Sequence, residues 1–298
     1  MNPTPPIIPD LSSLRASGGV DEGRRRFMRN SAAALAFVSV PNPIVTINGD
    51  EEYEIVHKNV KLPRLPKELR GLRVVVVSDI HSGPFMDKAQ MDRYVTRINK
   101  LKPDLVLLPG DFVSNRREEI EPLCDAFQKL EARHGVYGCT GNHDYFDDAD
   151  HVVNELEHAG VRMLRDAHAR IEIKGKELAL IGVDDIGQGA EFHASFRRAV
   201  DGLDARLPNI LLCHKPYHLE DAADYGAGLI VSGHTHGGQL VLARAFGLVF
   251  SIALLISKYV EGLYRVDATQ MYVTRGIGAS AINLRVNCPP EITVLTLV

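Results

Sequence analysis

The sequence has few cysteines and, beyond its first thirty residues, no long basic run, and each absence excludes a class of protein. The four cysteines among 298 residues show no Cys-x-x-Cys spacing, so neither a disulfide scaffold nor a zinc knuckle is indicated. The lack of basic clusters, together with a net charge of -4, argues against a nucleic-acid surface. The remaining composition, 45% hydrophobic and 24% charged, is ordinary for a globular enzyme.

Internal repeats, low-complexity tracts after residue 50 and long Pro/Gly linkers are also absent. We therefore expect one domain over residues 51–298. From Tyr53 onward, short apolar runs alternate with segments of helical spacing, which is typical of an α/β fold. Helices are expected near 88–100, 118–133 and 148–159, and strands near 72–77, 105–108, 135–139, 178–183, 210–213, 229–231, 271–274 and 292–297.

The first fifty residues are predicted to be an export signal or anchor rather than part of this domain. The run Arg24-Arg25-Arg26-Phe27-Met28-Arg29 precedes an uncharged stretch from Ser31 to Gly49. Paired arginines before a short apolar region resemble a twin-arginine leader, with Arg24 and Arg25 as the pair. This predicts recognition by the twin-arginine export machinery and a place in the periplasm or on the outer face of the inner membrane. The alternative is a basic arm followed by a helix.

Five clusters of histidine, aspartate and asparagine each follow an apolar run. They are Ser78-Asp79-Ile80-His81, Gly110-Asp111-Phe112, Gly141-Asn142-His143-Asp144, Cys213-His214-Lys215 and Gly233-His234-Thr235-His236. Each is weak alone, because a lone buried histidine is more often a core residue than a ligand. Together they indicate one site, because the functional loops of an α/β sheet lie beyond the carboxyl ends of its strands. Imidazole and carboxylate ligands favour borderline and hard divalent ions, so the set predicts a two-metal hydrolytic centre.

From Val74 to the C-terminus, the five clusters resemble those of the calcineurin-like metallophosphoesterase superfamily. The resemblance implies a catalytic domain whose β-sandwich is flanked by helices, in four αββα layers. It also implies one metal ion on Asp79, His81, Asp111 and His236, and a second on Asn142, His214 and His234, with Asp111 as the bridge. The His-Thr-His-Gly-Gly-Gln segment at 234–239 and the tail from Arg275 through Glu291 are similar to a bacterial exported subgroup.

This ligand set predicts a phosphodiesterase-like hydrolase. Two divalent ions, Mn, Fe or Zn, would activate a hydroxide and offset charge on a phosphodiester or pyrophosphate. His143 is placed to protonate the leaving oxygen, while Asp144 could orient His143 or cap the following segment. The motif from Gly110 to Asn115 lacks the Asp-Arg pair of the protein Ser/Thr phosphatases, which argues against that activity.

Two other functions stay open at this point. One is a lipid-linked pyrophosphatase of the UDP-2,3-diacylglucosamine hydrolase type. The other is a non-catalytic metal-binding scaffold. The presence of His143 together with every expected ligand argues against a scaffold.

The stretch from Leu240 to Ile256 is nearly all apolar apart from Arg244 and too short to span a bilayer. One interpretation is a core segment that packs under the sheet. The other is an apolar lip beside the metal centre, formed by Phe246, Leu248, Phe250 and Leu254, that makes peripheral membrane contact or holds the acyl chain of a lipid-linked substrate.

Overall fold

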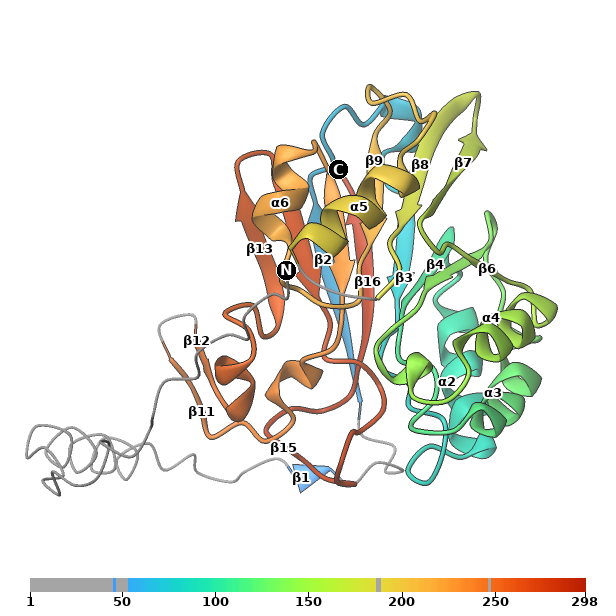
Figure 1. The fold of residues 1–298 in the computed structure, drawn as a ribbon, viewed down its shortest axis with the longest axis vertical. Helices are drawn as coiled ribbons and strands as arrows, with labels where there is room; N and C mark the ends of the chain where they lie inside the picture. The colour runs from blue at the N-terminus through green and yellow to red at the C-terminus, as the bar shows by residue number, and fades with distance from the viewer. Residues whose placement is uncertain (1–44, 47–52, 186–188, 246–247) are drawn as a thin grey trace, which may run out of the picture. The chain divides into compact units, whose positions relative to one another are not determined.

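Two six-stranded sheets and their flanking helices make up most of the computed structural model, which describes residues 45–46, 53–185, 189–245 and 248–298 (Figure 1). Apart from Val45 and Thr46, the predicted leader or anchor region of residues 1–50 lies outside the described residues. Within the described ranges, no helix combines the length and the apolar character needed to cross a bilayer.

The first sheet is parallel except where its second strand, β16, runs antiparallel to β3. Its inner strands are buried on both faces, as expected for parallel strands covered on both sides. In spatial order the strands are β2 (Glu54–Val60), β16 (Glu291–Leu297), β3 (Arg73–Val76), β4 (Leu105–Pro109), β5 (Val136–Cys139) and β6 (Val161–Met163).

The second sheet has three parallel pairings between two antiparallel edge pairings. In spatial order its strands are β13 (Gly262–Val266), β14 (Thr269–Val273), β10 (Leu229–Ser232), β9 (Asn209–Leu212), β8 (Lys176–Gly182) and β7 (Ala167–Ile173).

Three apolar cores hold the layers together, and strand alternation decides which side chain enters which core. In β3, Val74 and Val76 enter the core between the two sheets, where Leu180 and Leu212 meet them, whereas Val75 faces the helices on the other side. Those helices are α2 (Lys88–Lys100), α3 (Ile120–Phe127) and α4 (Ala149–His158). A third core joins the outer face of the second sheet to α5 (Ala190–Ala199) and α6 (Leu219–Asp224). The predicted four-layer αββα class is therefore confirmed.

Helix α2 shows how local sequence sets an element's limits. Asp87 caps its first turn by accepting a hydrogen bond from the Gln90 backbone at 2.8 Å, and the Gln90 side chain accepts one from the Asp87 backbone at 2.7 Å. Met91, Val95 and Ile98 then recur at helical spacing and are buried against the first sheet.

The described residues of the apolar stretch from 240 to 256 add no strand to the two large sheets. It forms a small hairpin of β11 (Ala243–Ala245) and β12 (Leu248–Phe250), followed by the short 3-10 helix η6 (Ile252–Leu255). One side of this segment packs into a small core with Val260 and Cys288, which leaves its other side in solvent. The interpretation as a core segment is therefore confirmed for this side only, and the core is separate from those of the two large sheets. Of the predicted lip residues, Phe250 is exposed and Leu254 half-buried, while Phe246 lies outside the described residues.

A second small pairing joins the start of the described chain to this region. Strand β1 (Val45–Thr46) runs antiparallel to β15 (Arg285–Val286), and Val286 also forms a bridge with Leu240. Val45 and Thr46 are thus held next to the hairpin.

Candidate metal centre

The five predicted clusters all follow the carboxyl ends of strands. Loops after β3, β4 and β5 carry the residues at 79–81, 111 and 142–144, and loops after β9 and β10 carry those at 214 and 234–236. Because each set of strands is parallel within its sheet, each sheet gathers its loops at one edge.

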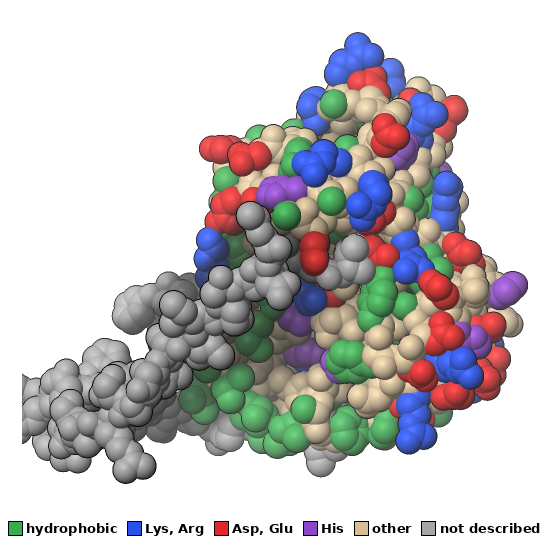
Figure 2. Space-filling model, viewed as in Figure 1, with side chains coloured by type: hydrophobic (Ala, Val, Ile, Leu, Met, Phe, Trp, Pro, Cys, Tyr) green, Lys and Arg blue, Asp and Glu red, His purple; other side chains and the backbone are tan. Residues whose placement is uncertain are grey.

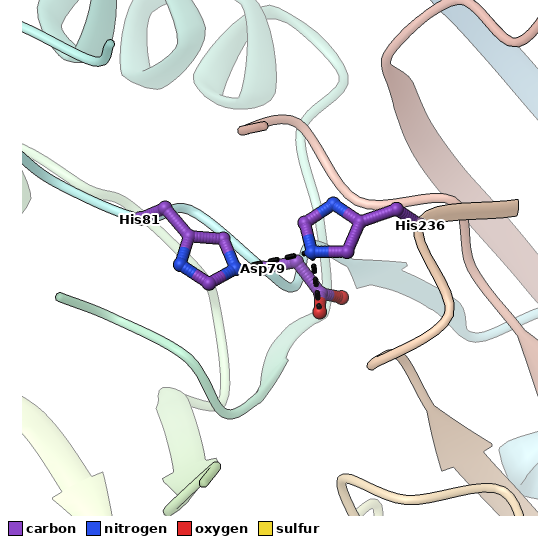
Figure 3. A group of neighbouring side chains, drawn as sticks. All are labelled: Asp79, His81 and His236. Atoms are coloured by element: carbon purple, nitrogen blue, oxygen red, sulfur yellow. Dashed lines mark hydrogen bonds and ion pairs between the residues drawn. The ribbon is translucent and has the colours of Figure 1, made fainter. Parts of the chain in front are cut away.

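One group of ligand atoms consists of Asp79, His81 and His236 (Figure 3). The Nε2 atoms of His81 and His236 are 3.1 Å apart, and His236 Nε2 is 3.6 Å from Asp79 Oδ1. Two nitrogens that each lie about 2.0–2.1 Å from one ion would be roughly 3.0–3.4 Å apart, depending on the coordination angle. All three side chains are buried, so the observed spacing is that of ligands to a shared cation.

A second group consists of Asp111, His214 and His234. Asp111 Oδ2 lies 3.2 Å from His214 Nε2 and also 3.5 Å from His81 Nε2 in the first group. One carboxylate oxygen therefore faces both groups, which is the arrangement that a bridging ligand requires.

Buried atoms without partners provide a test of whether these residues fit metal ions. Within the described chain, Asp79 Oδ2 and Asn142 Oδ1 are buried and accept no hydrogen bond. Burying an unpaired carboxylate or amide oxygen is costly, and native structures pair nearly all such atoms. A divalent cation at each ligand group would satisfy these oxygens, so the donor set fits.

The backbone at five of the ligands has a left-handed conformation, which non-glycine residues rarely adopt. Its φ angle is positive at the following ligands: Asp79 (51°), His81 (50°), Asp111 (56°), His234 (71°) and His236 (51°). Such conformations are held only where the surroundings impose them, and they cluster at functional sites. The sharp turns direct ligand side chains from separate loops toward a common point.

Burial and the two central carboxylates set the protonation states of the histidines. Burial lowers the pKa of His81 to about 4 and that of His234 to about 3, and it holds the pKa of His236 well below its usual value. These rings are therefore neutral, the form that binds metals. Burial also acts to lower the pKa of His214, but the Asp111 and Asp79 carboxylates outweigh it and raise this pKa to about 10. Metal binding at His214 must then displace a proton.

The His143 ring lies beside the first group, with its centroid 4.5 Å from that of His81. Its Nδ1 is 2.6 Å from the carbonyl oxygen of Ser114, so Nδ1 carries the proton of this hydrogen bond. Nε2 is then the nitrogen that can exchange a proton with a ligand.

Asp144 neither orients the His143 ring nor caps the next helix, which begins after a cap by Asp148. Its buried carboxylate instead accepts hydrogen bonds from the backbone N–H groups of the Asp111 loop and of Gly141. The distances are 3.1 Å from Asp111, 2.8 Å from Phe112, 3.3 Å from Val113 and 2.8 Å from Gly141. Asp144 therefore stabilises the loop that carries Asp111.

Two residues that support the ligands were not predicted from the sequence. The Tyr217 hydroxyl lies 2.8 Å from His234 Nε2, which leaves Nδ1 of that ring for a metal. The buried Arg285 guanidinium donates to the carbonyl oxygens of His236 and Gly278, among others, and so fixes the backbone behind His236. Tyr217 lies outside the five clusters, and Arg285 lies in the 275–291 tail without any signal of its own, so only the folded chain brings each to its histidine.

Comparisons with known proteins agree with this geometry. The profile of the calcineurin-like phosphoesterases matches residues 72–238. A "Transmembrane protein with metallophosphoesterase domain" from Danio rerio is 31% identical over 284 residues, which cover 90% of this chain but only 63% of that protein. The chain thus spans less than two thirds of this relative.

Two bacterial relatives match over nearly their whole length. The "Uncharacterized metallophosphoesterase YkuE" of Bacillus subtilis (strain 168) is 29% identical over 92% of this chain and 97% of its own length. The "Phosphodiesterase YaeI" of Escherichia coli (strain K12) is 28% identical over 92% of this chain and 99% of its own. With more than half of its residues matched by the family profile, the chain belongs to the calcineurin-like phosphoesterase family.

Proposed function

We propose that the protein is a dinuclear metal-dependent phosphoesterase that hydrolyses phosphodiester or pyrophosphate bonds. The observation that supports this most directly is the position of Asp111 Oδ2, which faces a histidine of each ligand group at 3.2 and 3.5 Å. His143 lies beside the same groups and keeps Nε2 for proton transfer.

One ion would be held by Asp79, His81, Asp111 and His236, and the second by Asp111, Asn142, His214 and His234. When bound, such ions supply Lewis acidity toward phosphoryl oxygens and a strong nucleophile at neutral pH. Mixed histidine and carboxylate sites accept several first-row metals, and we propose Mn, Fe or Zn.

The chain's own residues would handle the leaving group. As water attacks phosphorus, the bond from phosphorus to the leaving oxygen breaks and its electron pair moves onto that oxygen. His143 gives the oxygen a proton from Nε2, and the attacking water loses a proton to solvent. The Ser114 carbonyl keeps the His143 ring oriented throughout, since it binds Nδ1.

The simplest test is metal dependence. Purified protein supplied with Mn is expected to hydrolyse bis(4-nitrophenyl) phosphate, and a chelator should abolish this activity until Mn is restored. Metal analysis of the same samples should give about two ions per active chain. Full activity in chelator would contradict the mechanism, whereas bound metal without turnover would instead support a scaffold.

We further propose that the N-terminal segment directs export, as the Arg24-Arg25 pair predicts. The double substitution Arg24→Lys with Arg25→Lys keeps the charge but removes the arginine pair that the export receptor reads, so it should block export. Arg26 cannot re-form the pair alone once Arg25 is changed. Fractionation of cells that carry each version provides the measurement, and unchanged localisation of the double variant would refute the leader.

We also propose that the hairpin region makes peripheral contact with a membrane, which would suit a lipid-linked substrate. Its exposed side chains include Leu242 (60%), Ile252 (73%) and Leu255 (87%). Hydrophobic side chains gather along the lower edge of the face in Figure 2, beside the hollow where histidines are visible. The chain also arrives here from the uncharged N-terminal stretch, since β1 pairs with β15 next to Leu240. Exposed apolar patches of this kind mark interaction surfaces.

Replacing Ile252 and Leu255 together by serine should therefore weaken binding to anionic vesicles at least tenfold, since each inserted side chain contributes about 1.5–3 kcal/mol. Melting temperature and turnover of a soluble diester should not change, because both side chains are already exposed. Leu263→Ser, at an exposed position on β13, is the matched control. Vesicle co-sedimentation decides the matter, and undiminished binding by the double variant would exclude this surface.

A further inference from the structure

A cavity of about 350 Å³ opens beside the metal centre, and of the proposed metal ligands only His81 belongs to its lining. Its size falls within the range of about 300–1,000 Å³ that is usual for small-molecule pockets. Its lining has three parts: a first wall from the loops at 84–85 and 114–115, a second wall from residues 279–281, and the rings of His81 and His143. The wall residues are Pro84, Phe85, Ser114, Asn115, Ala279, Ser280 and Ala281.

The position of His143 tells which part of a substrate this cavity would receive. The phosphoryl group must lie at the metal ligands, and the leaving oxygen must lie within reach of His143 Nε2. His143 is itself part of the cavity lining. A leaving group attached to that oxygen therefore extends into the cavity, while the retained ester group points elsewhere.

Among the residues that the structure describes, the lining carries no lysine, arginine, aspartate or glutamate. A negative charge lies behind the first wall. The Glu119 carboxylate accepts hydrogen bonds there from the backbone N–H groups of Ser114 at 2.9 Å and Asn115 at 2.8 Å. Arg116 follows in sequence but is not part of the lining. Binding sites for phosphate groups normally offer lysine, arginine or clustered N–H donors, so a negatively charged leaving group would meet only the His143 ring here, which is neutral once it has given its proton.

The second wall is fixed in place by Gln239, the last residue of the His-Thr-His-Gly-Gly-Gln segment. Its side-chain amide donates to the carbonyl oxygens of Ser280 at 3.0 Å and Ile282 at 3.1 Å, and its oxygen accepts from the Ser280 backbone at 3.1 Å. The cavity is thus preformed, which reduces the entropic cost of binding. Gln239 also ties this wall to the turn that carries the ligand His236.

We infer that this cavity is the subsite for an uncharged leaving group, so that the protein cleaves phosphodiesters of neutral alcohols in preference to pyrophosphates. The inference rests on the proposed function and narrows it. In a pyrophosphate the leaving group is itself a phosphate, whose charge would enter a cavity that has no lysine or arginine in its described lining and is backed by Glu119.

The test compares two diesters that differ only in leaving group: a nitrophenol that bears a carboxamide and the same nitrophenol bearing a carboxylate. The native protein is expected to show a kcat/KM at least about tenfold higher for the neutral leaving group, since an unpaired charge costs more than about 1.4 kcal/mol. Ala281→Lys, at an exposed position of the wall, should remove this preference, whereas the uncharged control Ala281→Gln should keep it.

Equal kcat/KM for both substrates in the native protein would overturn the inference, and so would a full preference retained by Ala281→Lys. If neither diester is hydrolysed, the proposed function fails, but the cavity can still be judged. Calorimetry with the matching non-hydrolysable phosphonates then measures binding alone. Tighter binding of the neutral phosphonate by native protein supports the subsite, and equal affinity refutes it.

Discussion

Asp111→Asn should lose bound metal and hydrolysis together, with activity at least about 10³-fold lower, because a bridging charge worth several kcal/mol disappears from both ions. The structure also decides how the new amide would be oriented. Asp111 Oδ1 accepts a hydrogen bond from the His143 backbone at 2.8 Å, so the asparagine oxygen would keep that place. The amide NH₂ would then replace Oδ2 between His81 and His214, where it would repel a cation.

Metal analysis and turnover on the same preparation measure this effect. Asp104→Asn is a suitable control, since Asp104 is also buried but lies outside the centre, where it binds Arg73 and Arg133. A variant at position 111 that kept both metals and near-native turnover would show that this carboxylate does not bridge two ions.

His143→Ala should reduce hydrolysis of a diester with a poor leaving group by about 10² to 10⁴, the usual contribution of a general acid. A nitrophenolate leaves without protonation, so turnover of an activated diester should change much less. Metal content should stay near two per chain, because every proposed ligand is retained. Comparing the two leaving groups separates proton donation from other losses.

Phe146→Ala is the matched control. The centroid of the Phe146 ring lies 4.4 Å from that of His143, and this ring has no acidic proton to donate. It should retain most of the native activity toward both diesters. If His143→Ala instead loses metal, His143 is a metal ligand. Its ring lies close enough to His81 and Asp111 to hold an ion together with them. Equal losses with both leaving groups would also contradict the role as an acid.

Local patterns were sufficient to locate many elements of the fold. The helix predicted over 88–100 matches α2 because Asp87 and Gln90 mark its start and Met91, Val95 and Ile98 repeat at helical spacing. Strand β2 was not predicted, since its segment from Glu54 to Val60 is largely exposed and mixes charged with apolar residues. Such a strand is specified by its pairing with β16, which lies more than 230 residues away in the sequence. Its own residue pattern does not specify it.

The same distinction between local sequence patterns and long-range contacts applies to the candidate metal centre. The positions of Asp79, Asp111 and His214 after apolar runs indicated that they would meet, because strand ends gather at one edge of a sheet. The roles of Asp144, Tyr217 and Arg285 could not be predicted in this way. Each depends on the conformation of two loops at once, as when Asp144 binds four backbone N–H groups from two segments.

The ligands of each proposed ion come from both sheets: Asp79, His81, Asp111 and Asn142 follow strands of the first, and His214, His234 and His236 follow strands of the second. Neither sheet alone can therefore assemble a complete site, and an unfolded chain offers none. Metal loading must follow the docking of the two sheets, so the compartment in which the chain folds is also the one that selects its metal. If the chain is exported after folding, the ions available inside the cell, rather than those outside, determine which metal the exported protein carries.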